Sequence, residues 1–399
     1  MIRIAHIADT HIDADARVHG RLVLGPDGRN IRADDRVRCF QAAVDGAIAR
    51  GCHLVLHAGD LFERNRPTPA EYCEAQGIFD RLAAARVPCV LIADNHGSIE
   101  SATERHAVEP LTGRPGLTVS VRAELLRIET AAGPVQVATL PSPRRSILAA
   151  KEELKGLSPE AINALISEKL RAVLRPLRAG LYPSLPAILM FHGKIIGAWL
   201  TDLQQATGTE QIALTPEDFE GWDYVALGDF HGYQQVAPNA WYSGATDRTS
   251  YNEEHQAKGW ICAEMVAHKV GMAVVREFIE TPARRYITWE PAEIRDEGLL
   301  AQAEDEAQDL ASVPIFRAKG IVSQEEYDAL QPLLAHWREI PTFGEELEIS
   351  RQTTARSKDM TSDLTEEGAL RLWHGSNNRP EDLGLLLAEH RRIAGAVGQ

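Results

Sequence analysis

The sequence is poor in cysteine and in aromatic residues, with five cysteines and 6% Phe, Trp and Tyr. The cysteines are odd in number, scattered, and never spaced as Cys-x-x-Cys, at positions Cys39, Cys52, Cys73, Cys89 and Cys262. This pattern indicates neither a disulfide framework nor a thiolate zinc site. It predicts free buried thiols, because unpaired cysteine behaves as a small hydrophobic residue.

Membrane-spanning and export segments are also missing. No apolar run approaches the roughly 20 residues that a helix needs to cross a bilayer. The first residues, MIRIAHIADTH, lack the charged leader and long apolar stretch of a secretory signal. We therefore expect a cytoplasmic protein that does not associate with a membrane. A Gly-x-x-x-x-Gly-Lys-Ser/Thr loop is absent as well, so any use of ATP must come from another protein.

Basic residues are outnumbered by acidic ones, with 42 Lys and Arg against 57 Asp and Glu and a formal net charge of -15. This balance argues against a protein that coats nucleic acid by bulk electrostatics. It leaves nucleic acid open as a substrate, because a local basic surface or a basic partner can supply the phosphate contacts. Arginines recur in the first third of the chain, and a solvated surface is the alternative interpretation of each.

At 399 residues the chain exceeds what one hydrophobic core usually fills, so we expect one large domain and a smaller one. Its first part alternates apolar runs with amphipathic segments. The predicted elements are strands over 2–8, 53–58 and 88–93, separated by helices over 35–50 and from Thr68-Pro69 onward. This order predicts a parallel sheet with helices on its faces and with ligands at the carboxyl ends of the strands.

The pattern changes after residue 120. The predicted elements are a hairpin over 123–140, a helix from Ser158, and apolar strands over 187–191 and 224–227. Strand-like runs over 260–266, 270–280 and 284–289 then follow one another without helices, which predicts a second sheet stacked on the first. The expected fold class is α/β, a two-sheet β-sandwich flanked by helices, with a smaller α+β capping domain.

The expected boundaries are 1–285 for the large domain and 286–350 for the capping domain. Residues 351–366 are polar and poor in aliphatic side chains, which predicts a linker within a final segment over 351–399. That segment ends in a helix over about 380–395, which can either dock on a partner or pack on its own domain.

Side chains that bind metals follow the predicted strands. They are Asp9 and His11 after the first strand, Asp60 after the second, Asn95 and His96 after the third, and His192, Asp229 and His231 at later strand ends. In Asp-x-His both side chains point to the same side of an extended chain and can reach one ion. Aspartate and imidazole together suit borderline divalent ions, and an aspartate between two ions can bridge them. The recurrence of such residues at successive strand ends predicts a metal site.

Histidines inside the predicted strands are interpreted differently. His6, His53 and His57 lie within apolar runs rather than after them. We expect them to be core or near-core residues with satisfied ring nitrogens.

The blocks DTH, GDLFE, NH, FHG, GDFH and YSGATDRTSYNEE resemble those of the calcineurin-like metallophosphoesterases. Within that superfamily the chain most resembles the SbcD-type nucleases, whose partners are SbcC-type ATPases. The resemblance covers roughly residues 1–290. It implies the phosphoesterase sandwich fold, metal-dependent cleavage of DNA as an exonuclease or endonuclease in end processing or repair, an SbcC-type ATPase partner, and a homodimer.

Carried over to these positions, the resemblance implies two divalent metal ions. Asp9, His11 and His231 would hold one ion, Asn95, His192 and Asp229 the other, and Asp60 would bridge them. His96 would be the catalytic histidine, which stabilises phosphoryl charge or protonates the leaving oxygen. The residues expected to contact DNA are Arg17, Arg64, Arg66 and Arg105.

Two positions depart from the family pattern. The family has Gly-Asn-His-Asp after the third strand, whereas this chain has Asp94-Asn95-His96-Gly97. Asp94 is expected either to strain the turn and reduce activity or to take over the orientation of His96. Asp229 stands where the family commonly has histidine. Its harder oxygen ligand favours manganese, or magnesium, over zinc.

Three functions follow from these observations. A metal-dependent DNA nuclease is the first. A phosphatase or phosphodiesterase for small molecules is the second, and the overall acidity favours it. A binding subunit with a weakened site is the third, because of the exchange at Asp94 and Gly97.

Overall fold

The computed structural model describes residues 1–96, 105–142, 156–201, 204–205, 213–268 and 271–350, with parts of 365–397. Contacts divide the chain into two units, Met1–Lys319 with Leu333–Glu346 and Gly320–Pro332 with Leu347–Gln399. The domain boundaries expected from the sequence stay a prediction. The expected linker over 351–366 lies almost entirely outside the described residues.

The first sheet contains the parallel strands expected at the start of the chain. Its order is β16 (Gly271–Glu280), β15 (Gly259–His268), β1 (Ile2–Ile7), β2 (Leu54–His57), β3 (Cys89–Ile92) and β4 (Leu117–Ser120). Strands β1 to β4 pair in parallel, whereas β15 pairs antiparallel with both β1 and β16. The sheet is therefore mixed.

The second sheet is also mixed. Its order is β13 (Gln234–Ala237), β14 (Ala240–Tyr242), β12 (Tyr224–Gly228), β7 (Ala187–His192), β6 (Gly133–Leu140) and β5 (Glu124–Thr130). The predicted hairpin over 123–140 is the antiparallel pair β5 and β6. Strands β6, β7, β12 and β14 pair in parallel.

One expectation about the second sheet was wrong. Residues 260–289 do not form it: β15 and β16 extend the first sheet instead, and β17 (Tyr286–Trp289) belongs to a third sheet. No helix separates β15 from β16, so they form an antiparallel hairpin, and β15 pairs along the free edge of β1. The lack of helices between strands indicates antiparallel pairing but does not specify which sheet the pair joins.

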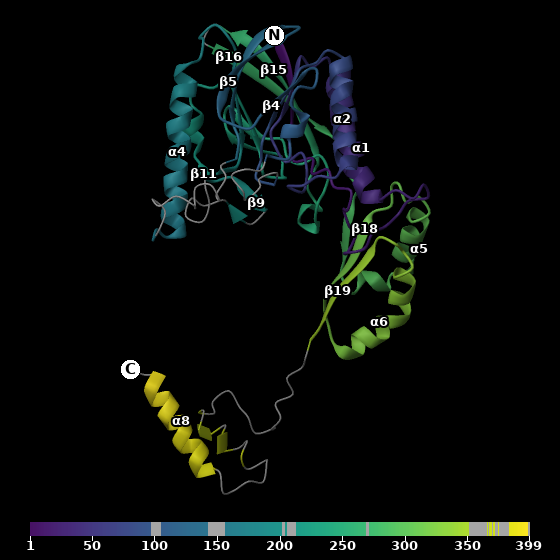
Figure 1. Ribbon diagram of the computed structural model, residues 1–399. Helices are drawn as coiled ribbons and strands as arrows, with labels where there is room; N and C mark the ends of the chain where they lie inside the picture. Colours follow the sequence, from purple (N-terminus) through teal and green to yellow (C-terminus); the bar gives the residue numbers. More distant parts are fainter. Residues whose placement is uncertain are drawn as a thin grey trace. The chain divides into compact units, whose positions relative to one another are not determined.

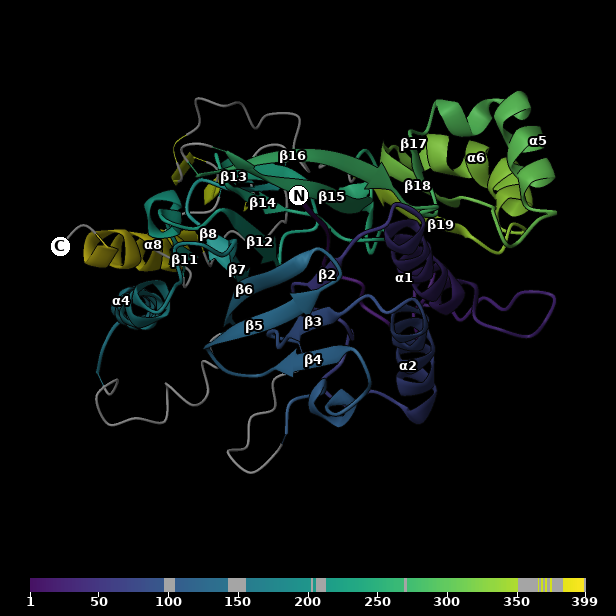
Figure 2. The ribbon, with the colours of Figure 1, turned by 90° about the horizontal axis from the view of Figure 1, so that it is seen from above.

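Helices cover the outer faces of the two sheets (Figures 1 and 2). α1 (Ile31–Ala49) and α2 (Pro69–Ala84) lie on one side, and α4 (Pro159–Ala179) lies on the other. Alternation along β1 explains this layering, because Ala5 and Ile7 pack among the buried residues of α1 and α2 whereas Ile4 packs between the sheets. Leu170 and Leu174 of α4 pack against the far face of the second sheet.

Polar residues fix where these helices begin. Asn30 accepts a hydrogen bond from the Arg32 backbone N–H and caps α1. Thr68 and Glu71 form the expected capping box of α2, and Ser158 caps α4 ahead of Pro159. These caps satisfy backbone donors that the first turn of a helix leaves without partners.

The third sheet lies after residue 285. Its order is β17, β18 (Ile315–Val322) and β19 (Phe343–Ile349), with α5 (Glu297–Glu306) and α6 (Gln324–Trp337) between its strands in sequence. Two short pairs of strands lie between β7 and β12 in sequence. They are β8 (Lys194–Ile195) with β11 (Ala213–Leu214) and β9 (Trp199–Thr201) with β10 (Gln204–Gln205). The terminal helix α8 spans Leu383–Val397.

The cysteines follow the sequence except for Cys73. Four of the five cysteines are free and buried, but Cys73 is exposed on α2. His6 is buried between the sheets, where its ring nitrogens bond to the Tyr224 hydroxyl and the Leu227 carbonyl at 3.0 Å each. His57 is buried as expected, but its Nδ1 has no hydrogen-bond partner among the described residues, so its ring is not fully satisfied. Within the described ranges, no helix combines the length and the apolar character that crossing a membrane requires.

A buried cluster of charges joins α1 to the segments around residues 247 and 284. Arg32 Nη1 lies 2.6 Å from Asp35 Oδ2, and Arg32 Nη2 lies 2.9 Å from Asp247 Oδ2. Arg284 donates to Asp35 Oδ1 at 2.9 Å and to the carbonyl oxygens of Leu310 and Ala311. Asp35 thus pairs with two buried guanidinium groups, of which Arg32 is also paired with Asp247.

We expect Asp35→Ala to lower the free energy of unfolding by about 3 to 5 kcal/mol, because it leaves buried positive charge uncompensated. Chemical denaturation of the two proteins measures this. The matched control is Asp45→Ala, which removes an exposed pair with Arg81 and should leave the free energy of unfolding nearly unchanged. Equal losses in the two variants would show that the cluster does not stabilise the fold.

Candidate metal centre

The strand ends that carry the predicted ligands meet at one edge of the sandwich. Asp9, Asp60 and Asn95 follow β1, β2 and β3 of the first sheet. His192 ends β7, and Asp229 directly follows β12 in the second sheet. The ligands therefore come from the carboxyl ends of parallel strands, as expected, but from two sheets rather than one.

Positive backbone φ angles are concentrated at these residues. The described non-glycine residues with positive φ include Asp9 at 52°, His11 at 46°, Asp60 at 51° and Asp229 at 102°. Such angles cost free energy in L residues and persist only where surrounding contacts impose them. Four residues proposed as ligands from sequence are thus held in unfavourable backbone conformations, which is typical of a functional site.

Backbone hydrogen bonds join the loops after β1 and β2. Asp9 N–H donates to the Gly59 carbonyl at 3.1 Å, and the N–H groups of Thr10 and His11 both donate to the Asp60 carbonyl at 2.9 Å. Gly59 has a φ of 100°, and a Cβ atom there would lie 2.3 Å from His192 Nδ1. The glycine therefore lets the second sheet's histidine approach this loop.

Each proposed histidine ligand has an oxygen atom close to Nδ1, in a hydrogen bond for His192 and His231 and in an ionic contact without hydrogen-bond geometry for His11. His192 Nδ1 lies 2.8 Å from the Ala58 carbonyl, His231 Nδ1 lies 2.8 Å from Glu253 Oε1, and His11 Nδ1 lies 3.1 Å from Glu63 Oε2. An acceptor at Nδ1 places the proton there and leaves the Nε2 lone pair facing the centre. This arrangement is typical of metal-ligating histidine.

Asp60 faces two groups of ligands with its two oxygens. Its Oδ2 lies 3.6 Å from His11 Nε2, and His11 Nε2 lies 3.0 Å from His231 Nε2. Its Oδ1 lies 3.4 Å from His192 Nε2. Asp60 therefore occupies the position that a bridging carboxylate requires.

The second group is completed by Asn95 and Asp229. Asn95 Oδ1 lies 3.1 Å from His192 Nε2, and Asn95 Nδ2 donates to Asp229 Oδ1 at 3.2 Å. Asp229 Oδ1 also lies 3.8 Å from His192 Nε2. Asp9 lies next to both groups, because it clusters with His11 and His231 and also with Asp60 and His192.

These residues fit divalent cations. Asp9 Oδ2, Asp60 Oδ1 and Asp229 Oδ2 are buried oxygens with no hydrogen-bond partner among the described residues. A buried carboxylate oxygen without a donor is unfavourable unless a cation or a proton compensates it. Oxygen and imidazole ligands around a shared carboxylate are the ligand set of divalent metal ions.

Burial and mutual repulsion shift the protonation of the carboxylates. Burial raises the pKa of Asp9 to about 6. Burial and the neighbouring Asp94 and Asp9 carboxylates raise the pKa of Asp60 well above its ordinary value. Protonation is thus favoured where no cation compensates the charge.

The pKa values of His11 and His231 are shifted in opposite directions. Burial lowers the pKa of His11 to about 4. Burial also opposes protonation of His231, but the hydrogen bond with Glu253 and the negative charges of Glu253 and Asp9 together outweigh burial and raise the pKa of His231. The neutral form of His11 is the form that binds a metal.

His96 lies at the rim of the centre, and Asp94 does not orient it. Its Nδ1 lies 2.9 Å from the Glu63 carbonyl, and its Nε2 lies 3.8 Å from Asp60 Oδ2. Asp94 instead accepts the Asp60 backbone N–H. The turn is not strained at Asp94, because the described non-glycine residues with positive φ do not include it. Gly97, the other half of the exchange, lies outside the described residues.

The arginines expected at DNA differ in their surroundings. Arg64 forms ion pairs with Asp13 and Asp15 at 2.7 Å each. Arg17 is exposed and donates to the Gly20 carbonyl at 3.2 Å. Arg66 and Arg105 are exposed. Their role in binding DNA stays a prediction.

Several supporting residues were not assigned from the sequence. Glu63 and Glu253 orient His11 and His231, and Lys258 lies 2.7 Å from Glu253 Oε2. His57, interpreted as a core residue, is buried and lies 3.1 Å from the Thr10 hydroxyl. The available signal was that both glutamates stand inside the GDLFE and TSYNEE blocks. Pairing each with one histidine requires the fold.

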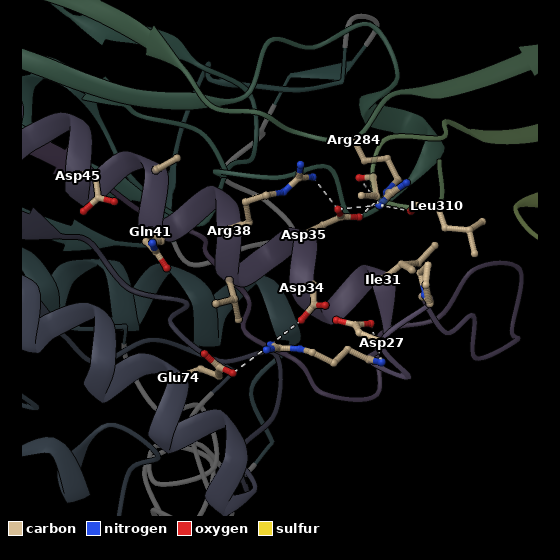
Figure 3. A pocket seen from close by; sticks show the side chains of 16 residues that line it. Asp27, Ile31, Asp34, Asp35, Arg38, Gln41, Asp45, Glu74, Arg284 and Leu310 are labelled. Atoms are coloured by element: carbon tan, nitrogen blue, oxygen red, sulfur yellow. Dashed lines mark hydrogen bonds and ion pairs between the residues drawn. The ribbon is translucent and has the colours of Figure 1, made fainter. Parts of the chain in front are cut away.

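A pocket of about 710 Å³ beside α1 contains none of the predicted ligands (Figure 3). Its charged side chains pair with one another: Arg29 lies 2.6 Å from Asp34 and 3.2 Å from Glu74, and Arg38 lies 2.7 Å from Asp35. The pocket therefore lacks the convergent ligands that distinguish the strand-end centre.

Comparison with known families agrees with this geometry. Residues 2–129 match the family model described as calcineurin-like phosphoesterase. The chain contains a calcineurin-like phosphoesterase domain. The two mixed sheets flanked by helices are the fold of this phosphoesterase family, and Asp9, Asp60 and Asn95 lie within the matched residues.

Two curated relatives of this chain are both described as DNA double-strand break repair protein Mre11. The protein from Methanosarcina mazei is 26% identical over 258 residues, which cover 63% of this chain and 34% of that protein. The protein from Methanosarcina acetivorans is 33% identical over 97 residues, which cover 24% of this chain and 14% of that protein. The chain thus spans well under half the length of these relatives.

Two solved structures are similar to this phosphoesterase at low identity. A dimetal phosphatase from Danio rerio is 12% identical with a TM-score of 0.37, over 69% of this chain and 98% of that chain. Purple acid phosphatase PPD1 from seeds of yellow lupin, Lupinus luteus, is 12% identical with a TM-score of 0.37, over 70% of this chain and 51% of that chain.

We expect the affinity of the protein for manganese to fall about tenfold or more between about pH 7.5 and about pH 5.5, because a cation must displace ligand protons. The sign follows from the raised pKa of Asp9, about 6, since the carboxyl is increasingly protonated below that pH. Calorimetric titration in buffers of different ionisation enthalpy measures both affinity and protons released. An affinity that does not change over this range would contradict the assignment of Asp9.

Proposed function

We propose that this chain is a metal-dependent DNA nuclease of SbcD type that hydrolyses phosphodiester bonds in DNA end processing or repair. The observation that carries the proposal is Asp60, whose two oxygens face two separate groups of ligands. The two curated relatives, both described as DNA double-strand break repair proteins, support DNA as the substrate.

The protein's own residues have three roles in this reaction. One cation would be held by Asp9, His11 and His231. The other would be held by Asn95, His192 and Asp229, and Asp60 would bind both cations. Two divalent cations so held supply a nucleophilic water at neutral pH and neutralise charge on the phosphoryl oxygens. Glu63, Glu253 and the Ala58 carbonyl keep the three histidine Nε2 atoms directed at the centre.

His96 is the proposed acid. Its Nδ1 lies 2.9 Å from the Glu63 carbonyl, so Nε2 is the nitrogen directed at the centre and accessible to substrate. In its protonated form His96 donates from Nε2 to the leaving oxygen or to a phosphoryl oxygen. Partial exposure of the ring at the rim suits contact with a large substrate.

The partners follow from the same proposal. An SbcC-type ATPase would supply ATP hydrolysis, and the protein would act in the cytoplasm as a homodimer. Arg17, Arg66 and Arg105 would contact DNA phosphates, because they are exposed and arginine binds phosphate bidentately. Arg64 would contribute less, since Asp13 and Asp15 already pair with it.

The net charge of -15 favours the second candidate, hydrolysis of a small phosphoester. Both candidates use the same centre, so substrate preference separates them. A weakened binding subunit is less consistent with the geometry, because Asn95 and His96 both reach the centre despite Asp94.

We expect His96→Ala to lower manganese-dependent DNA cleavage by about 10²- to 10⁴-fold, the typical contribution of a general acid. Labelled single- and double-stranded DNA should be assayed beside bis-p-nitrophenyl phosphate. The control is His336→Ala, which removes an exposed histidine of α6. Turnover of the small ester without DNA cleavage would support the second candidate, a hydrolase of small phosphoesters. No activity on either substrate would support the third candidate, a binding subunit with a weakened site.

We propose manganese as the cofactor, with magnesium as the alternative, because three carboxylates, Asp9, Asp60 and Asp229, provide hard oxygen ligands. Activity measured after chelation and reconstitution should be highest with manganese and lowest with zinc. Reversal of this order by Asp229→His would assign the preference to that carboxylate. An enzyme active only with zinc would contradict the assignment.

A further inference from the structure

Asp94 occupies a position behind the centre rather than in it. It follows β3, is buried, and its Oδ2 accepts the backbone N–H of Asp60 at 3.0 Å. The sequence block that resembles the family would place glycine here, which has no side chain to accept this bond. The carboxylate at this position is therefore a feature of this chain.

The Asp60 backbone connects Asp94 to the rest of the centre. Its N–H donates to Asp94, and its carbonyl accepts the N–H groups of Thr10 and His11 at 2.9 Å each. Asp60 itself has a φ of 51°, a conformation that lasts only where surrounding contacts impose it. Asp94 supplies one of those contacts and thereby helps to fix the direction of the Asp60 side chain.

His106 holds Asp94 from the opposite side. Its ring is buried, and its Nδ1 lies 3.3 Å from the Val108 backbone nitrogen, whose N–H points at it. Its Nε2 lies 3.1 Å from the Asp94 carbonyl oxygen, 3.3 Å from the Asp94 backbone nitrogen and 3.6 Å from Asp94 Oδ1. The His106 N–H donates to Glu109 at 2.8 Å, so the ring is held by its own loop.

We propose that Asp94 and His106 are positioning residues for Asp60, and that they increase the affinity of the centre for divalent cations. The proposal rests on the proposed function, because it takes Asp60 to be the bridging ligand. Groups that orient a ligand typically change metal affinity or activity by about 10- to 100-fold when removed. Asp94 also places a further carboxylate beside Asp60, which adds electrostatic attraction for cations.

Three variants test the two contributions. Asp94→Ala removes both the acceptor and the charge. Asp94→Asn keeps an oxygen of the same shape for the Asp60 N–H but removes the charge. His106→Phe keeps Asp94 and removes the ring nitrogens that hold it. The matched control is Asp223→Ala, since Asp223 Oδ2 accepts the Ala187 N–H at 2.8 Å, at the opposite end of β7 from His192.

Calorimetric titration with manganese chloride is the readout, together with the thermal unfolding midpoint of each protein. Asp94→Ala should lose about 10- to 100-fold in manganese affinity, and Asp94→Asn and His106→Phe should lose less. Asp223→Ala should lower the unfolding midpoint while binding manganese as the parent does. At saturating manganese, the KM for DNA of Asp94→Asn should match that of the parent, because Asp94 does not touch substrate.

The outcomes separate this inference from the proposed function. If the parent binds manganese and all three variants bind it within about twofold of the parent, the inference is overturned and the proposed function stands. If the parent binds no manganese, the proposed function fails and the inference with it. If Asp94→Ala does not fold, the affinities of Asp94→Asn and His106→Phe decide the question.

Discussion

The organisation of this protein depends on the need to compensate a buried carboxylate, that of Asp60. Its two oxygens lie among imidazole nitrogens and other carboxylates, and Oδ1 has no hydrogen-bond partner among the described residues. A buried charge of this kind is stable only when protonated or bound by cations. The positive φ angles at Asp9, His11, Asp60 and Asp229 are the conformational cost of bringing these side chains together.

The sandwich provides the framework for that arrangement. Parallel strands of each sheet end at the same edge, so β1, β2 and β3 supply ligands from one layer and β7 and β12 from the other. Gly59 permits the approach of His192 across the layers, because a side chain there would meet its ring. Helix caps such as Thr68 and the Asp35 cluster hold the helices that cover this framework. The candidate metal ligands thus come from the carboxyl ends of strands in two sheets rather than from a single loop.

Much of the centre could be predicted from the sequence, because strand ends in a parallel sheet are local and ordered. The apolar runs, the capping box at Thr68 and the ligand-type residues after each strand are all readable from spacing. The placement of β15 and β16 could not be predicted from spacing, since a hairpin can pair with an edge of either sheet. The pairings of Glu63 with His11 and of Glu253 with His231 join residues that are distant in sequence, so they depend on tertiary packing.

Asp94 shows why one departure from a family pattern needs a structure. From sequence it was expected either to strain the turn or to orient His96, and in the fold it instead accepts the Asp60 N–H.

The most direct test of the two-metal centre is anomalous diffraction at the manganese edge from crystals grown with manganese. The account predicts two peaks about 3.5 to 4 Å apart, with Asp60 between them. A single peak, or peaks bound by other residues, would contradict it.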